Sequence, residues 1–143
     1  QDVFIGLSIG NVLTPEMIGK MNDNPIIFAL ANPVPEITPD LAKESGAKLI
    51  ATGSSKYPNQ VNNILVFPGL FKGLLLSKAN KVDLSLQLEV AKQLAAMVAE
   101  PTVEKFIPNV FDEGVANVVS QAVLDYLQKL KENEDNIHAE NIK

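Results

Sequence analysis

Neutral amide side chains gather in one short stretch of this 143-residue chain. The stretch "YPNQVNN" holds Asn59, Gln60, Asn62 and Asn63, and a run of apolar residues follows it. Asn32 is a further amide, placed where the apolar run "PIIFALA" ends before a proline. A carboxamide can donate to a carboxylate or pair with another carboxamide without adding a charge that would shift nearby titrating groups. These residue types are therefore suited to binding a small polar or anionic ligand.

Each of these amides also has an ordinary local explanation. Asn-Pro pairs open loops through backbone preference, which would account for Asn32. Asn63 fits a helix cap and Asn59 fits a turn residue. Local roles explain each residue singly, but they explain the whole group beside Asn32 less well. Spacing alone leaves both interpretations open.

Other residues with reactive side chains give weaker signals. His138 is the only histidine and lies in the C-terminal tail, where we expect a solvated surface residue. We interpret Lys56 and Tyr57 as exposed loop residues rather than catalytic groups. Asp112 and Glu113 are typical of acids at the start of a helix rather than of a metal pair. The sequence therefore offers no catalytic residue and no metal ligand.

The amides must be positioned by the elements that precede them. Short apolar runs at 3–7, 25–31 and 47–53 predict strands buried on both faces. Thr-Pro-acid starts predict helices at 15–21 and 41–45 between those strands. This alternation implies parallel pairing with right-handed crossovers, so the loops after the strands share the edge where open parallel sheets bind ligands.

The sequence of the second half of the chain predicts helices. A Pro-Gly start predicts a helix over 68–79. The apolar residues of 82–98 alternate as in a strand, but they also fit a helix with Leu84 and Leu88 on its apolar face. We predict a helix, because the alanines that follow favour helix formation. A covering loop over 103–111 and a last helix from 112 to 131 complete the prediction.

Composition narrows the class of protein. Twelve basic against seventeen acidic residues give a net charge of −5, which argues against a nucleic-acid partner. No apolar run approaches the ~20 residues of a membrane span. The chain has no cysteine, which excludes disulfides and thiol catalysis and fits the cytoplasm. Gly6 and Gly10 do not form the G-x-G-x-x-G pattern that cradles a dinucleotide phosphate.

Four motifs in a fixed order resemble a known family. "DVFIGLS", "PIIFALANPVPEI", "ATGSSKYPNQVNN" and "FPGLFKGLL" resemble the C-terminal part of the NAD(P)-binding domain of bacterial-type malic enzymes. "IPNVFDEGVANVVSQAV" is similar to the terminal helix region of that family, and the resemblance covers residues 2–130. It implies an α/β fold: part of a Rossmann-like, doubly wound parallel sheet with helices on its faces and a helical C-terminal half. We expect residues 1–131 to form this domain portion and 132–143 a solvated tail.

The resemblance also implies an activity. Malic enzymes oxidatively decarboxylate (S)-malate to pyruvate and CO₂ with NAD or NADP and with Mg²⁺ or Mn²⁺. The catalytic tyrosine and lysine, the metal carboxylates and the glycine-rich loop of that family precede the equivalent of Gln1. We therefore expect a fragment that is inactive alone. Its expected partners are malate or pyruvate and further copies of itself, in a dimer or higher homo-oligomer, with no nucleic acid and no membrane.

Binding residues carry over from the family motifs. The residues that match the malate-binding asparagines are Asn32, Asn62 and Asn63. The residues that match the coenzyme channel are Gly6, Leu7, Ser8 and Asn32.

One loop departs from the family pattern "TGRSDYPNQ". Ser54 stands in place of the arginine and Lys56 in place of the aspartate, which inverts the local charge. The choice between NAD and NADP is therefore not readable from this chain.

Two other functions stay open at this stage. The chain could belong to an amino-acid-oxidising Rossmann dehydrogenase, or it could be a noncatalytic ligand-binding or assembly module. Under the fragment interpretation, a doubly wound sheet that lacks its early strands exposes an apolar edge, so we also expect self-association.

Overall fold

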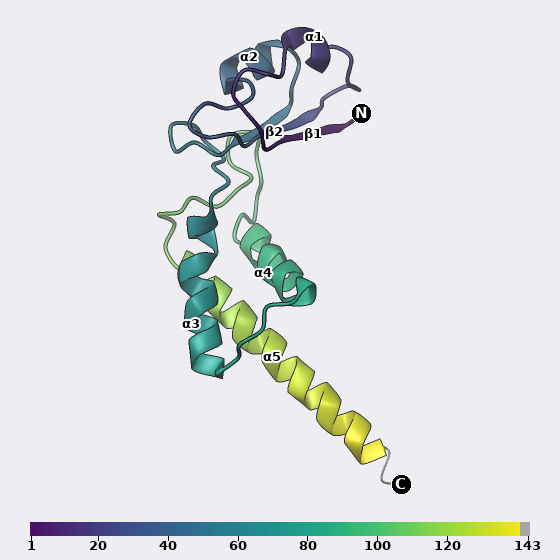
Figure 1. The fold of residues 1–143 in the computed structure, drawn as a ribbon, viewed down its shortest axis with the longest axis vertical. Coiled ribbons are helices and arrows are strands. Elements are labelled where there is room, and N and C mark those ends of the chain that lie inside the picture. The colour runs from purple at the N-terminus through teal and green to yellow at the C-terminus, as the bar shows by residue number, and fades with distance from the viewer. Residues whose placement is uncertain (141–143) are drawn as a thin grey trace. The chain divides into compact units, whose positions relative to one another are not determined.

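The computed structural model describes the backbone of residues 1–140 and the side chains of residues 1–133. The chain divides into two compact units. The first unit comprises Gln1–Asn62 and Val98–Asn109, and the second comprises Asn63–Met97 and Val110–Lys143. The sheet belongs to the first unit, and long helices make up the second (Figure 1).

The first unit is built on a parallel sheet of three strands, as predicted. These are β1 (Val3–Gly6), β2 (Ile26–Ala29) and β3 (Leu49–Thr52), with β2 in the centre. The last residues of the three strands are in register, Gly6 beside Ala29 and Ala29 beside Thr52. The loops that follow the strands therefore leave the sheet along one edge, which we call the carboxyl edge.

Two short helices connect the strands. In α1 (Pro15–Ile18) the hydroxyl of Thr14 accepts a hydrogen bond from the Met17 amide at 3.4 Å, which confirms the predicted cap. This helix ends before the predicted residue 21, because the Lys20 amide bonds the Met17 carbonyl three residues back and tightens the chain into turns. The second helix, α2 (Pro39–Glu44), starts at the proline after Thr38, two residues before the predicted start.

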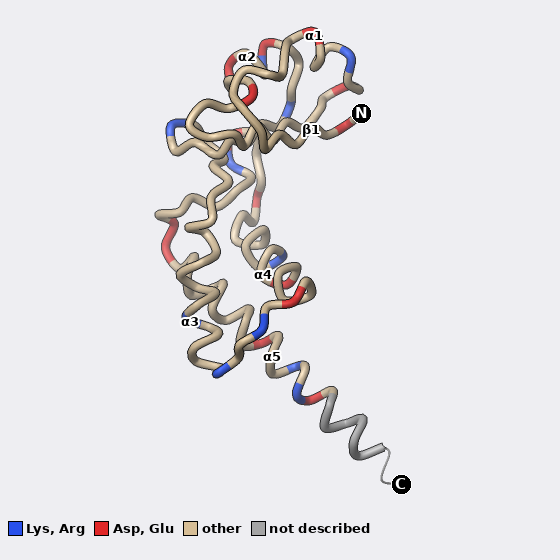
Figure 2. The backbone as a smooth tube through the Cα atoms, in the orientation of Figure 1, with Lys and Arg blue, Asp and Glu red and all other residues tan. Residues whose placement is uncertain are grey.

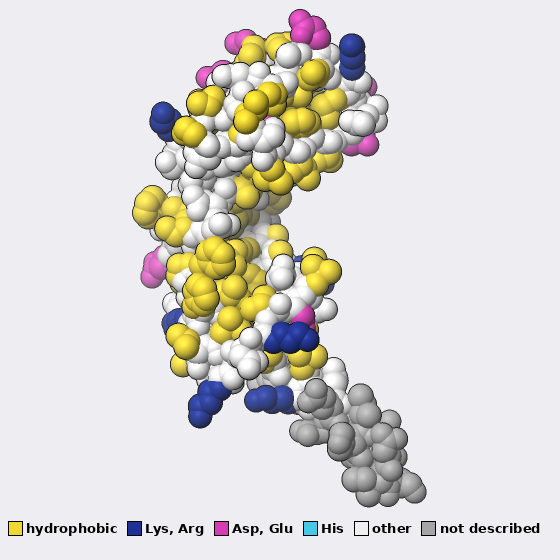
Figure 3. Space-filling model, viewed as in Figure 1, with side chains coloured by type: hydrophobic (Ala, Val, Ile, Leu, Met, Phe, Trp, Pro, Cys, Tyr) yellow, Lys and Arg dark blue, Asp and Glu magenta, His cyan; other side chains and the backbone are white. Residues whose placement is uncertain are grey.

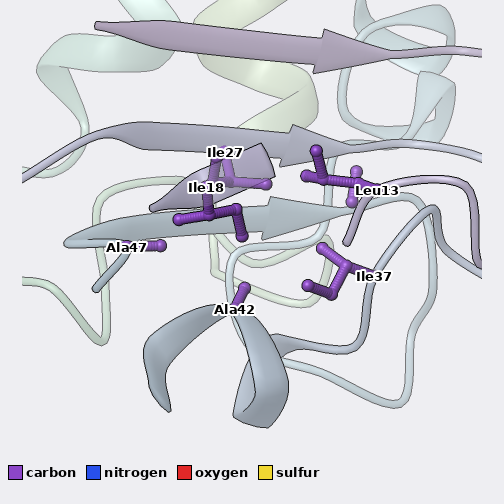
Figure 4. Packing of buried hydrophobic residues seen from close by; sticks show 7 residues of the cluster. Leu13, Ile18, Ile27, Ile37, Ala42 and Ala47 are labelled. Carbon is purple, nitrogen blue, oxygen red and sulfur yellow. The ribbon is translucent and has the colours of Figure 1, made fainter. Parts of the chain in front are cut away.

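The core of the first unit lies on one face of the sheet (Figure 4). There Ile27 of β2 packs with Ile18 of α1 and Ala42 of α2. On the opposite face, the ring of Phe106, from the predicted covering loop, meets Phe28 edge-on with centroids 6.4 Å apart.

The prediction that all strands are buried on both faces is wrong for β1. Val3 is 45% exposed and Ile5 is 61% exposed. Within the described residues β1 pairs only with β2, and the helices of this unit pack on the face that carries Ile27. The side chains of Val3 and Ile5 alternate to the other face, where they keep contact with solvent.

The second unit begins with the 3₁₀ turn η1 (Asn63–Leu65) and contains α3 (Phe67–Ser77), α4 (Leu84–Ala96) and α5 (Val115–Glu140). The helical reading of 82–98 is confirmed, but the predicted apolar face is wrong. Leu84 and Leu88 are exposed at 69% and 53%. Leu86, Val90 and Leu94 form the buried face instead.

Asp83 sets the start of α4 and connects it to α5. Its carboxylate accepts the Leu86 amide at 2.8 Å and the Tyr126 hydroxyl at 3.1 Å. The pKa of Asp83 is lowered, mainly by the Leu86 amide and further by the Tyr126 hydroxyl. The pKa of Tyr126 is raised by desolvation and by the hydrogen bond to Asp83.

The last helix is longer than predicted. It starts at Val115, after Gly114 adopts a φ of +87°, rather than at residue 112. Its backbone stays helical to Glu140, past the predicted end at 131. The predicted solvation of the tail 132–143 stays a prediction, because side chains beyond 133, including His138, lie outside the described residues.

Candidate ligand site at the carboxyl edge

The structure brings the predicted coenzyme residues of the first unit to the carboxyl edge. Gly6 ends β1, and Leu7 and Ser8 follow it as exposed residues. Asn32 follows β2 and is also exposed. The Leu30 amide donates to the Gly6 carbonyl at 3.0 Å, which joins the two departing chains. The edge thus presents the exposed residues Leu7 and Ser8 and the exposed amide Asn32.

Glu36 joins these two loops and was missed by the sequence analysis. Its side chain is fully buried, with 0% exposure. One carboxylate oxygen accepts the Ser8 amide and the other accepts the Ala31 amide, each at 3.0 Å. The sequence holds one signal for it: Glu36 is the only charged residue between Ile26 and Ile37, a stretch in which Asn32 is the only other polar residue. A lone acid in such a run is unusual unless hydrogen bonds satisfy it.

Gly6 has a structural reason to be glycine. A Cβ atom at this position would lie 2.5 Å from both the Cδ and the Oε1 atoms of Glu36. Because side-chain atoms do not approach so closely, only glycine leaves the carboxylate in its place. The predicted contact of Gly6 with a coenzyme stays a prediction.

The amide cluster separates into two groups, and the first is structural. Asn59 is 7% exposed. Its Nδ2 donates to the Val103 carbonyl at 3.2 Å, and its Oδ1 accepts the amides of Phe106 and Ile107 at 2.9 and 3.3 Å. Gln60 donates to the Gly53 carbonyl at 3.4 Å. Asn59 therefore fastens the covering loop, and Gln60 holds the turn after β3.

The second group follows the end of β3. Gln60 forms a parallel β-bridge with Thr52, the last residue of that strand. The Val61 amide donates to the Thr52 carbonyl at 2.8 Å. This course carries Asn62 past the carboxyl end of β3, where it is exposed. Asn63 is exposed as well, and its carbonyl accepts the Val66 amide at 2.9 Å as η1 begins. That Asn32, Asn62 and Asn63 grip one ligand stays a prediction.

The loop that departs from the family pattern is held by its own hydroxyls. Ser54 is 8% exposed, and its Oγ accepts the Lys56 amide at 3.3 Å. Its own amide donates to the Thr52 hydroxyl at 3.3 Å. A serine can thus close this turn without the arginine of the family pattern.

The described part of the chain supplies few groups for other chemistry. It holds no group of three or more His, Cys, Asp or Glu residues that could bind a metal ion. None of its helices combines the length and the apolar character that a membrane crossing requires. Lysines are scattered along the described backbone rather than gathered in a stripe (Figure 2).

An open parallel sheet with the exposed residues Leu7, Ser8 and Asn32 at its carboxyl edge is typical of a Rossmann-like domain of the kind that binds nucleotides. The sequence model of the family described as "Malic enzyme, NAD binding domain" matches residues 1–128. The chain belongs to this family.

Individual relatives agree with the family. The chain is 45% identical over 124 residues to the bifunctional malic/malolactic enzyme of Bacillus subtilis (strain 168), covering 85% of this chain and 30% of that protein. It is 45% identical over 126 residues to the NAD-dependent malic enzyme of Geobacillus stearothermophilus, covering 87% of this chain and 26% of the relative.

A solved structure shows the same fold. The malic enzyme from Pyrococcus horikoshii Ot3 superimposes with a TM-score of 0.87 at 42% identity, covering 91% of this chain and 30% of that one. The chain therefore spans less than a third of the length of these relatives.

Proposed function

We propose that this chain forms part of an enzyme that oxidatively decarboxylates (S)-malate to pyruvate and CO₂ with NAD or NADP. The observation that carries the proposal is the exposed amide Asn32 on the same edge as the exposed residues Leu7 and Ser8. The family membership of the chain and the names of its relatives supply the reaction.

The donor set at the edge fits a nicotinamide coenzyme. A carboxamide side chain can pair with the carboxamide of nicotinamide, and the exposed residues Leu7 and Ser8 lie at the edge where open parallel sheets bind ligands. When bound, the coenzyme accepts the hydride that leaves the malate C2 carbon. In this proposal Asn32 orients the nicotinamide and malate, and Asn62 and Asn63 hold a malate carboxylate by hydrogen bonds.

The described residues do not fit a metal site, because they lack a cluster of ligand side chains. The proposal therefore assigns Mg²⁺ or Mn²⁺ and the acid and base of the reaction to the rest of a full-length enzyme. The 143-residue chain alone should form no NAD(P)H from malate. We further propose a homo-oligomeric enzyme in the cytoplasm, a compartment that suits a chain without cysteine.

Alanine substitution of the amides tests the assignment in the full-length enzyme. Each of Asn32→Ala, Asn62→Ala and Asn63→Ala should raise the KM for malate or lower kcat, with kcat/KM falling at least about fivefold, since a lost buried hydrogen bond is worth about 1–3 kcal/mol. Steady-state kinetics of malate-dependent NAD(P)H formation supply the measurement.

A matched control lies at the opposite edge of the sheet. Asn22 is also an exposed asparagine, and it donates to Asp2 at 2.9 Å before β2 begins. Asn22→Ala should leave kcat/KM within about twofold, because a surface change away from special features alters free energies by about 0.5 kcal/mol or less. Unchanged kinetics in all three edge variants would refute the assignment. Oxidation of an amino acid but not of malate would instead favour another Rossmann dehydrogenase.

A further inference from the structure

Glu36 is a buried carboxylate to which the proposed reaction assigns no role. Burying an acid is unfavourable unless its oxygens find donors. Glu36 is 0% exposed, and both of its oxygens are used, one by the Ser8 amide and one by the Ala31 amide. The two donors come from different loops, which follow β1 and β2. A single side chain therefore holds the two loops in a fixed relation.

Backbone hydrogen bonds extend this connection. The Asn11 amide donates to the Pro35 carbonyl at 3.0 Å, and the Leu13 amide donates to the Glu36 carbonyl at 3.1 Å. The segment that carries Glu36 is thus fastened to the loop after β1 by main chain as well as side chain. Gly6 completes the arrangement, because any larger residue would displace the carboxylate.

We infer that Glu36 is a positioning residue, which holds Ser8 and Asn32 in the geometry that binds the nicotinamide coenzyme. The inference rests on the proposed function. Ser8 bonds Glu36 directly, and Asn32 follows Ala31, whose amide is the second donor. Glu36 itself is shielded from solvent, so it acts through these two residues and not by touching the coenzyme.

The geometry requires a carboxylate of this length. Both oxygens accept hydrogen bonds, so an isosteric glutamine would turn an NH₂ group toward one backbone N–H and leave that donor without an acceptor. Aspartate keeps the charge but is one methylene shorter, so it cannot reach both amides from the same backbone position. Either substitution should loosen one loop relative to the other.

The experiment measures coenzyme binding in the full-length enzyme with Glu36→Gln. Titration with NAD and with NADP, followed by calorimetry, gives both the affinity and the number of sites per chain. A loosened edge should raise the Kd of the preferred coenzyme at least about tenfold while the number of sites stays near that of the wild type. A residue needed only for folding would instead lower the number of sites and leave the Kd of the folded molecules unchanged.

Further variants keep the inference testable if glutamine prevents folding. Glu36→Asp should raise the Kd in the same direction, while Glu44→Gln, an exposed glutamate of α2, should bind like the wild type. If Glu36→Gln or Glu36→Asp folds and binds within about twofold of the wild type, the inference is wrong. A wild-type enzyme that binds neither NAD nor NADP would overturn the proposed function, and the inference with it.

Discussion

Asn59 and Asn62 are the same residue type three positions apart, yet the fold gives them different environments. Asn59 has a φ of +55°, a left-handed conformation that asparagine adopts more readily than most residues. This backbone turns its side chain inward, where it bonds three main-chain groups of the covering loop. Asn62 stays exposed beyond β3. Amide chemistry alone does not show which of the two asparagines fastens a loop and which stays exposed.

Replacing Asn59 by alanine should lower the free energy of unfolding by about 1–3 kcal/mol, because buried main-chain groups lose their hydrogen bonds. Asn59→Gly also loses these bonds but accepts the positive φ, so it should cost less than alanine by about 1 kcal/mol. Urea denaturation gives both values. The structural role would be contradicted if Asn59→Ala unfolded at the urea concentration of the wild type.

The sequence predicts which loops meet at the carboxyl edge, but it does not predict the role of Glu36 there. Parallel pairing predicts that the ends of β1 and β2 share an edge, and so places Leu7, Ser8 and Asn32 together. The role of Glu36 depends on a hydrogen bond to Ser8, 28 positions away in the chain. No local sequence pattern predicts a hydrogen bond between residues so far apart in the chain. The only sequence signal for the role of Glu36 is that it is the one charged residue in a largely apolar stretch.

At the scale of elements, local signals predicted which segments form helices and strands better than which faces they bury. The Thr14 cap and the apolar runs gave the first helix and the strands within a few residues. The buried face of α4 was misread because leucines occur on both sides of this helix, and exposure follows from packing against α5. Periodicity cannot choose between two apolar faces.

Packing of α3 against α5 depends on two glycines one helical turn apart. A Cβ atom on Gly73 would lie 2.6 Å from the Val123 Cβ and 2.9 Å from the Ser120 carbonyl oxygen. Gly69 is similarly close to Val119. Helix propensity favours alanine over glycine by about 1 kcal/mol, whereas overpacking costs about 1–3 kcal/mol. One neighbour is a main-chain atom and cannot rotate away. Packing should therefore determine whether alanine at position 73 raises or lowers the free energy of unfolding.

We therefore expect Gly73→Ala to lower the free energy of unfolding by up to about 2 kcal/mol, despite its better helix propensity. Gly19→Ala is the matched control: its nearest neighbour would be the Pro15 carbonyl at an ordinary 3.5 Å, so it should be neutral or stabilising. Urea denaturation measures both. Combining Gly73→Ala with Val123→Gly, which removes the Cβ atom that the new methyl group would meet, should cost less than the sum of the two single changes. Strict additivity would contradict the proposed contact.

At the scale of the whole molecule, the chain exposes more large apolar side chains than local patterns suggested. In the second unit, Phe67, Phe71 and Leu75 stand one helical turn apart on α3 and are 45%, 58% and 79% exposed. The rings of Phe67 and Phe71 stack with centroids 5.7 Å apart. Hydrophobic side chains gather over this helix (Figure 3). In the first unit, Val3 and Ile5 of β1 are exposed in the same way. The order of the elements was predictable from the sequence, whereas exposure depends on what covers each face.

Exposed apolar surfaces of this kind favour association, so the 143-residue chain should self-associate as its concentration rises. Light scattering after size exclusion, across a hundredfold range of concentration, should show an increasing mean mass. Ile5→Lys places a charge on β1 and Phe71→Lys places one on α3, so the variant that restores the monomer mass identifies the surface responsible. Leu88→Lys, on the exposed face of α4, is the control for added charge. A monomer mass for the wild type at every concentration would refute self-association.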